Sequence, residues 1–249
     1  MGLRRLVSWI SVSLALGCAT TPDGEVEKTP EQLSEFHYKL ANGYFYEHQV
    51  PAALAELTTA IQHNPENPDA HHLLGFIYFG RKDFVSAESH FRRALEIRPG
   101  FHQARANLGA LLLEQRRWRD SIEAVEPLVG ASLYPTPWVP YNNLGLAYEG
   151  LGERRKALEQ YKMALFHQAN FCLGLLNAGR MLRELGDLDP ALEHFRRATD
   201  KCKSFPDPHF QIAEILEERG QLLEARNEFQ ACWKDAPDSP LGMRCKRRL

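Results

Sequence analysis

The chain has 249 residues, of which 44% are hydrophobic and 25% charged, fractions typical of a soluble globular protein rather than a disordered or fibrous one. Lys and Arg number 30 against 32 Asp and Glu, and the resulting net charge of −2 argues against a nucleic-acid-binding protein driven by bulk charge. Only the N-terminal region contains a long apolar run, so we expect no internal membrane-spanning segment.

The N-terminus has the organisation of an export signal. Arg4 and Arg5 precede an uncharged, mostly apolar run at 6–16, which is too short to span a bilayer but suits the apolar core of a signal peptide. The run ends in Leu-Gly and is followed at once by Cys18, a pattern that resembles the lipobox of bacterial lipoproteins. The resemblance implies cleavage before Cys18 and acylation of its thiol. An ordinary signal peptide followed by a chance cysteine is the alternative.

Lipidation would hold the mature chain on a membrane. Each buried methylene of an acyl chain contributes about 0.8 kcal/mol, so several chains give a stable anchor. The residue after the lipidated cysteine is Ala19 and not Asp, which by resemblance to Gram-negative sorting rules implies the outer membrane, with the protein facing the periplasm. We assign residues 1–17 to the signal peptide and 18–33 to the lipidated cysteine and a polar, flexible tether.

A repeat of 34 residues accounts for nearly all of the chain after the tether. Small residues recur at this interval, with one step of 36, at Ala53, Ala87, Ser121, Ala157, Ala191 and Ala225. A pair of residues, the second one small, precedes each of them, at Leu40-Ala41, Leu74-Gly75, Leu108-Gly109, Leu144-Gly145, Ala178-Gly179 and Ile212-Ala213. The pattern resembles the tetratricopeptide repeat, a helix–turn–helix unit. It predicts an all-α fold, a right-handed superhelix of six helical hairpins with a short C-terminal capping helix.

The register sets the expected boundaries. The six repeats span 34–67, 68–101, 102–137, 138–171, 172–205 and 206–239, and the cap spans 240–249. Gly152, Gly186 and Gly220 fall in the turns between the two helices of a repeat, where glycine adopts a positive φ at little cost. The third repeat contains Pro127 in its second helix and two extra residues in its link, so we expect a kink or looser stacking there.

The cysteines predict two cross-links. Four remain after Cys18, and an even number in an exported chain indicates disulfides. The two helices of a repeat are antiparallel, so Cys172 at the start of repeat 5 should lie near Cys202 at its end. We predict the bond Cys172–Cys202. Cys232 could then reach Cys245 in the cap, with a buried free thiol at Cys232 as the alternative.

Motifs for catalysis or metal binding are not found in the sequence. It contains no phosphate-binding loop, nucleophile elbow or zinc-protease motif and no recognisable acid–base pair, so we expect no enzyme, no cofactor and no metal site. His37, His71 and His209 share the fourth position of their repeats, and we interpret them as packing residues. The basic tail 244–248 is interpreted as a solvated helix end, with contact to anionic lipid as the alternative.

The concave face of a helical-repeat superhelix is an extended binding surface. Repeats 1 and 2 carry a mainly aromatic set at the positions expected to face it: Tyr38, Asn42, Phe45, His72, Phe76 and Phe79. Exposed apolar side chains mark partner sites, so we predict that this set binds another protein. Packing of some of these rings within their own repeats is the alternative.

Later repeats carry polar side chains on the same helices. One repeated position has an amide, at Asn107, Asn143, Asn177 and Gln211, and such amides could pair with an extended peptide backbone. Arg180 and Arg183 in repeat 5 should face Glu214, Glu217 and Glu218 in repeat 6. We interpret these five residues as an internal charge network.

The lipobox, the six repeats at this length and the irregular third repeat together resemble the type IV pilus pilotins of the PilF/PilW family, as does the stretch Leu133-Tyr134-Pro135 to Asn143-Leu144-Gly145-Leu146. That family implies a non-catalytic lipoprotein that binds secretin subunits and promotes assembly of the secretin ring in the outer membrane. The partners it implies are secretin subunits and outer-membrane lipid, with no nucleic acid and no small-molecule substrate. A lipoprotein subunit of the outer-membrane protein insertion machinery, and an enzyme or an activator of a cell-wall enzyme, are the alternatives.

Overall fold

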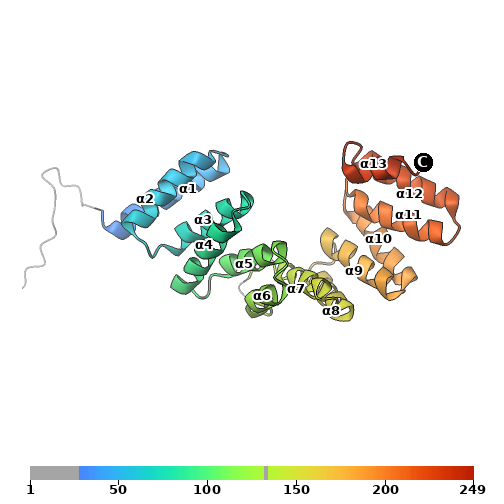
Figure 1. Ribbon diagram of the computed structural model, residues 1–249, viewed down its shortest axis with the longest axis horizontal. Helices are drawn as coiled ribbons and strands as arrows, with labels where there is room; N and C mark the ends of the chain where they lie inside the picture. Colours follow the sequence, from blue (N-terminus) through green and yellow to red (C-terminus); the bar gives the residue numbers. More distant parts are fainter. Residues whose placement is uncertain (1–27, 132–133) are drawn as a thin grey trace, which may run out of the picture. The chain divides into compact units, whose positions relative to one another are not determined.

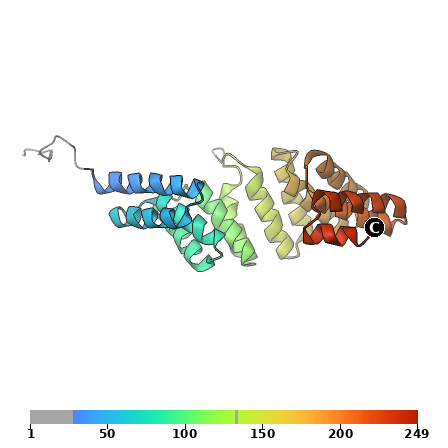
Figure 2. The same ribbon diagram turned by 90° about the horizontal axis from the view of Figure 1, so that it is seen from above.

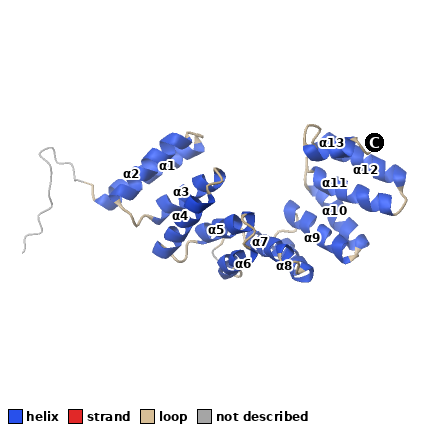
Figure 3. Ribbon diagram, in the orientation of Figure 1, coloured by secondary structure: helices blue, strands red, loops and turns tan. Residues whose placement is uncertain are grey.

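The computed structural model describes residues 28–131 and 134–249 (Figure 1). Within these two ranges the regular secondary structure is entirely helical, with thirteen α-helices and one short 3₁₀ helix (Figure 3). The predicted all-α class is therefore confirmed. The signal peptide, Cys18 and most of the assigned tether lie outside the described residues.

The N-terminal unit of the chain ends at Pro65 and contains the first hairpin, α1 (Pro30–Tyr46) and α2 (Val50–His63). Helix α1 begins inside the range 18–33 that we assigned to the tether, so the last four residues of that range are helical. The cause is a capping box. Thr29 Oγ1 accepts a hydrogen bond from the backbone N–H of Gln32, and Gln32 Oε1 accepts one from the backbone N–H of Thr29.

The C-terminal unit, Glu66–Leu249, contains the other five repeats and the cap. Its helices are α3 (Pro68–Gly80), α4 (Phe84–Ile97), α5 (His102–Glu114), α6 (Trp118–Val125), η1 (Glu126–Leu128), α7 (Trp138–Gly150), α8 (Arg154–His167), α9 (Cys172–Leu185), α10 (Leu188–Lys201), α11 (Pro206–Glu218), α12 (Leu222–Asp235) and α13 (Pro240–Lys246). The first helix of each of these repeats begins at the residue where the 34-residue register predicts it. Within this unit each helix packs on its hairpin partner, and each second helix packs on the first helix of the next repeat (Figure 2).

Glycine allows the two helices of a repeat to approach closely. Gly75, Gly109, Gly145 and Gly179 lie on the first helices of repeats 2 to 5 and face Phe91, Val125, Tyr161 and Phe195 on the second helices. A Cβ atom added to any of these glycines would lie 2.2–2.7 Å from the opposite side chain, closer than a carbon contact permits. The small residue of each predicted pair is therefore required by the packing of its own hairpin.

Repeat 3 has a shortened second helix and a longer link to the next repeat. Its second helix, α6, has 8 residues, whereas α4 and α8 have 14 each. Pro127 has no backbone N–H to continue the α-helical pattern, and the chain forms the 3₁₀ turn η1 instead. Tyr134 in the following link is buried and packs with Leu128 and Ala106, which anchors the link to the repeat. The irregularity expected in repeat 3 is therefore a truncated helix with an anchored link.

Both predicted disulfide pairs are present. Cys172 bonds to Cys202 with a Cα–Cα distance of 5.9 Å, and Cys232 bonds to Cys245 with a Cα–Cα distance of 6.1 Å. The first bond ties the start of α9 to the residue after α10. The second ties the capping helix α13 to α12.

The basic side chains of the tail are exposed and also contact the fold. The Arg244 guanidinium lies 4.6 Å from the centre of the Phe210 ring and the Lys246 ammonium 4.8 Å from that of Trp233. Arg248 forms an ion pair with Glu217. Three of the four basic side chains therefore have partners within the fold while staying exposed, which agrees with a solvated helix end.

The turn between the two helices of a repeat contains one residue with a positive φ in every repeat. In repeats 4 to 6 this residue is glycine, as predicted, with φ of 76°, 90° and 74° at Gly152, Gly186 and Gly220. In repeats 1 to 3 the corresponding residues have side chains and still adopt φ of 60°, 61° and 57°, at His48, Lys82 and Arg116. The same turn is therefore built from residues with very different intrinsic preferences for it.

Candidate functional site

The first helices of repeats 2 to 6 form the inner side of the C-terminal unit. In Figure 1, α3, α5, α7, α9 and α11 lie along the inside of the arc that this unit makes, and α4, α6 and α8 lie outside it. We call these two sides the inner face and the outer face. Numbering each repeat from its first residue, we expected positions 5, 6, 9 and 12 to point inward.

Phe76 is the most exposed residue of the predicted aromatic set on α3. It occupies position 9, and 42% of its surface is accessible. Phe79 at position 12 instead packs against Phe84 of the same repeat, with ring centres 6.1 Å apart. His72 lies 4.8 Å from the ring of Phe101. The alternative of packing within the fold therefore applies to Phe79 and His72, while Phe76 is the exposed member of the set.

A hollow in repeats 3 and 4 has a mixed lining, in which Glu114, Arg116 and Glu149 stand beside apolar side chains. Leu113 at position 12 of repeat 3 and Leu146 at position 9 of repeat 4 line it together with Trp118, and its volume is 550 Å³. The Trp118 ring lies against the Cα of Gly150, where a Cβ atom would come within 2.4 Å of it. Sequence analysis did not single out these residues, although the same register positions that contain Phe76 and Phe79 would have found both leucines.

In the N-terminal unit, the residues that are exposed differ from those predicted. Tyr38, Asn42 and Phe45 are half-buried, whereas Phe36 and Leu40 are 44% and 37% exposed. These last two occupy positions 3 and 7 of repeat 1.

Positions 3 and 7 are buried in every later repeat, where the residues are Ala70, Leu74, Ala104, Leu108, Pro140, Leu144, Gly174, Ala178, Pro208 and Ile212. Of the described residues before α1, Lys28 places its ammonium 4.5 Å from the centre of the Phe36 ring, and no helix there packs on Phe36 and Leu40. Helix α1 therefore presents an apolar face that the repeats of the C-terminal unit cover with another helix.

The predicted row of amide side chains makes contacts within the fold. Asn177 Nδ2 donates to Asn142 Oδ1 over 3.1 Å, and Asn143 is buried. Asn107 Nδ2 lies 2.9 Å from His72 Nε2. Burial lowers the pKa of His72 to about 4, so the ring is neutral and Nε2 can accept this hydrogen bond. The amides join neighbouring repeats to each other, which corrects the expectation that they present free donors and acceptors to a peptide.

The predicted charge network is present, with different pairings. Arg183 lies 2.7 Å from Glu214 and 2.5 Å from Glu218, as expected. Burial alone would lower the pKa of the Arg183 guanidinium, but hydrogen bonds to the two carboxylates outweigh it and raise that pKa. Arg180 instead pairs with Glu149 of repeat 4 over 2.5 Å. Glu217 does not join this network and pairs instead with Arg248 in the C-terminal cap.

The histidines at position 4 bridge the two helices of their repeats. His37 Nδ1 lies 2.6 Å from a carboxylate oxygen of Glu56, and His209 Nδ1 lies 2.6 Å from one of Glu228. In repeat 2 the partner is another histidine, with 3.0 Å between His71 Nδ1 and His90 Nδ1. Burial and the neighbouring His71 lower the pKa of His90 to about 4. Each partner follows its histidine by 19 residues and occupies position 23.

Nothing in the described parts of the chain resembles a metal centre or a membrane span. No cluster of three or more potential metal ligands occurs among the described residues. No helix within residues 28–131 and 134–249 is both long and apolar enough to cross a bilayer.

Comparison with known proteins agrees with the repeat register. A sequence profile of the tetratricopeptide repeat family matches residues 38–100 and 142–207, which is about half of the chain. The chain belongs to the tetratricopeptide repeat family.

Individual proteins of this repeat family resemble the chain over most of its length. It is 24% identical over 193 residues to the type IV pilus assembly protein PilF of Pseudomonas aeruginosa, covering 76% of each protein. The structure of PilW, described as a widely conserved type IV pilus biogenesis factor, superposes with a TM-score of 0.77 at 23% identity, covering 86% of this chain and 98% of PilW. The solved PilF of Pseudomonas aeruginosa superposes with a TM-score of 0.75 at 18% identity, covering 88% of this chain and 99% of that one. The likeness to the two solved structures establishes the fold.

Proposed function

We propose that this tetratricopeptide repeat protein is an outer-membrane lipoprotein of type IV pilus biogenesis, a pilotin that binds secretin subunits and promotes assembly of the secretin ring for pilus-dependent motility. Within that family it resembles the myxobacterial member Tgl over the full chain. The observation that carries the proposal is the likeness to PilF across three quarters of both proteins, together with the apolar side chains that the first helices of the early repeats leave exposed.

The exposed residues support binding of a protein segment rather than of a small molecule. Phe76 and the hollow lined by Leu113, Leu146 and Trp118 supply aromatic and aliphatic surface on the inner face. Exposed clusters of this kind are typical of the anchor points of protein interfaces. The face of α1 that contains Phe36 and Leu40 is a second apolar surface of the same kind.

The disulfides support an exported location. Such bonds persist in oxidising compartments, which include the bacterial periplasm, and are rare in the cytosol. Acylation of Cys18 would then hold the repeats against the membrane in which the ring forms. Confining both partners to one surface raises their effective concentration, and this promotes assembly without any chemical step.

The first experiment tests the binding surface. We expect Phe76→Ala to weaken binding of a purified secretin fragment to the soluble repeats and to reduce secretin multimers in cells, and Phe36→Ala with Leu40→Ala tests the face of α1 in the same assay. Phe166→Ala is the matched control, because Phe166 is 80% exposed on α8 of the outer side. Unchanged binding and multimers in both the Phe76 and the Phe36/Leu40 variants would reject these surfaces.

A second experiment tests the anchor. We expect Cys18→Ser to remove the protein from the outer-membrane fraction and to reduce secretin multimers, while the soluble repeats still bind the secretin fragment. An unchanged membrane fraction in this variant contradicts lipidation at Cys18. Secretin binding that is absent from the wild-type repeats contradicts the pilotin role itself.

A further inference from the structure

A second hollow lies on the outer face of the C-terminal unit, and it results from one departure from the repeat register. Position 23 is Ala124 in repeat 3, whereas the other repeats have Glu56, His90, Gln160, His194 and Glu228 there. In repeats 1, 2 and 6 that longer side chain reaches the histidine at position 4 and covers the surface between the helices. Repeat 3 has Arg105 at position 4, and the methyl group of Ala124 leaves the space beside it open.

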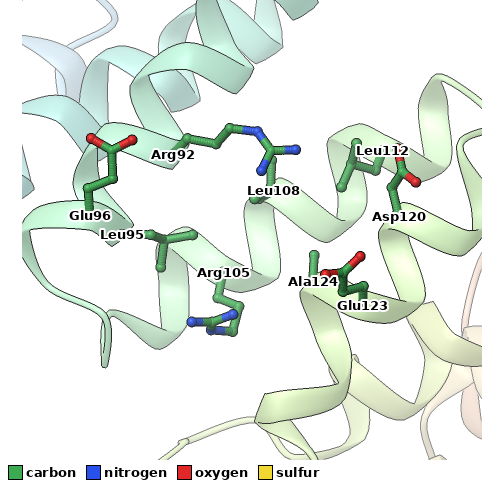
Figure 4. A pocket seen from close by; sticks show the side chains of 9 residues that line it. All are labelled: Arg92, Leu95, Glu96, Arg105, Leu108, Leu112, Asp120, Glu123 and Ala124. Carbon is green, nitrogen blue, oxygen red and sulfur yellow. The ribbon is translucent and has the colours of Figure 1, made fainter.

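The hollow has an apolar floor and helical walls. Its volume is 410 Å³, within the range of about 300–1,000 Å³ that is usual for ligand pockets. Leu108 and Leu112 of α5, both almost fully buried, lie at its base with Leu95 of α4 and Ala124 of α6, and charged side chains of the same three helices line the rest (Figure 4). Since α4 and α6 stand on either side, the opening has the shape to receive a side chain from outside the molecule.

The unpaired charges around the rim indicate which charged groups a bound partner would need. On the α6 wall, Asp120 is paired with Arg117 over 2.7 Å, but Glu123 has no ion pair among the described residues and is exposed. On the α4 wall, Arg92 is paired with Glu88 and Glu96 with Arg93.

Arg105 donates to the backbone carbonyl of Pro99 and has no carboxylate partner within the described ranges. The charges left to be matched are therefore one carboxylate on α6 and one guanidinium on α5.

We propose that this hollow is a docking site for a helix of a partner protein that inserts one leucine or phenylalanine over Leu108 and Leu112. A lysine or arginine one turn from that side chain would meet Glu123, and an aspartate or glutamate one turn away on the other side would meet Arg105. The site lies on the outer face and does not depend on the proposed pilotin function, whose surfaces are on the inner face and on α1.

Filling the hollow is the direct test. We expect the purified repeats to bind a fluorescently labelled helical peptide with the pattern Glu-x-x-x-Leu-x-x-x-Lys, measured by fluorescence anisotropy. Ala124→Gln supplies the residue that repeat 4 has at the same position, and we expect it to weaken binding about tenfold or more by steric exclusion. Gln160→Ala is the matched control and should leave binding unchanged. Far-ultraviolet circular dichroism and thermal unfolding confirm that both variants are folded.

Charge reversal tests the proposed orientation. Glu123→Lys should weaken binding of the lysine peptide and favour a peptide in which that lysine is replaced by glutamate. Replacing the central leucine of the peptide with serine should remove binding to every variant. Absence of binding to the wild-type repeats, equal binding to wild type and Ala124→Gln, or indifference to the charge exchange would each overturn the proposal.

Discussion

The first three repeats and the last three share one hairpin geometry but differ in the turn residues and cross-links that stabilise it. At the turn that requires a positive φ, the last three have glycine, whereas the first three have His48, Lys82 and Arg116. A residue with a Cβ atom adopts this conformation at a cost of about 1–2 kcal/mol. The early hairpins therefore keep local strain that the late ones avoid.

The cross-links are also unevenly distributed. Both disulfides lie in repeats 5 and 6 and the cap. Ion pairs between successive repeats occur in both halves. Repeats 4 to 6 are joined by Arg154–Glu184, Arg180–Glu149, Arg183–Glu214 and Arg219–Asp189, and repeats 1 to 3 by Arg93–Glu66 and Arg117–Glu88. The C-terminal edge of the last repeat is covered by α13, whereas the outward face of α1 is exposed.

The difference suggests a division of labour. The surfaces that we propose for binding, which are α1, Phe76 and the two hollows around repeat 3, all lie in the first four repeats. Binding surfaces require exposed apolar groups and tolerate strain, and both disulfides lie outside them, in repeats 5 and 6 and the cap. The four predictions below test this comparison.

Removing the disulfide of repeat 5 should have the largest effect on stability. Replacing Cys172 and Cys202 together with serine opens a link across a sequence separation of 30 residues, and the loop-entropy relation gives a loss of about 3–4 kcal/mol in the free energy of unfolding. Chemical denaturation followed by circular dichroism measures the loss. A midpoint equal to that of the wild type would show that repeat 5 does not rely on its disulfide.

The close helix contact is common to both halves and should be equally sensitive in both. Gly75→Ala places a Cβ atom 2.7 Å from Phe91, and Gly179→Ala places one 2.5 Å from Phe195. We expect each change to reduce the free energy of unfolding by about 1–3 kcal/mol, because the large ring must shift. Denaturation of the two variants in parallel measures the two losses. A large loss in only one of them would mean that the halves differ in packing as well as in cross-linking.

Acidic pH should reduce the stability of repeat 2, because His90 binds a proton more readily in the unfolded chain than in the folded one. The folded pKa of about 4 lies below the ordinary value of 6.5, so between these values the unfolded chain binds a proton that the folded chain does not. The contribution of His90 is complete above pH 6.5 and is lost as the pH falls towards 4, by about 1 kcal/mol at pH 5.5.

We expect His90→Gln, which copies Gln160 of repeat 4, to reduce the loss of stability between pH 7.5 and 5.5. Thermal unfolding of both proteins at the two pH values measures it. An identical pH dependence in the variant would assign the acid sensitivity to other groups.

Exchanging the turn residues should have the smallest effect, with opposite signs in the two halves. Lys82→Gly relieves a positive φ and should stabilise the protein by about 0.5–1 kcal/mol, while Gly186→Ala should destabilise it by about 1 kcal/mol. Thermal unfolding at one pH detects both shifts. Shifts of the same sign would show that the turn residue is not what distinguishes the halves.

The sequence by itself determined the helices and their order. The 34-residue spacing placed the starts of α3, α5, α7, α9 and α11, because each repeat packs with the same period of small and large residues. It also indicated the pair Cys172–Cys202, since antiparallel hairpins bring the two ends of a repeat together, and this left Cys232 to reach Cys245 in the cap. The early start of α1 could have been predicted too, from Thr29, Pro30 and Gln32.

Only the tertiary structure decided which side chains are exposed. Phe76 and Phe79 follow the same pattern in the sequence, yet one is exposed and the other packs on Phe84. Asn177 finds Asn142 one repeat away, and Ala124 leaves a hollow only because α4 and α6 stand beside it. A repeat period specifies which face of a helix points toward its neighbours, but the contacts that a side chain makes depend on neighbours that stacking brings from other repeats.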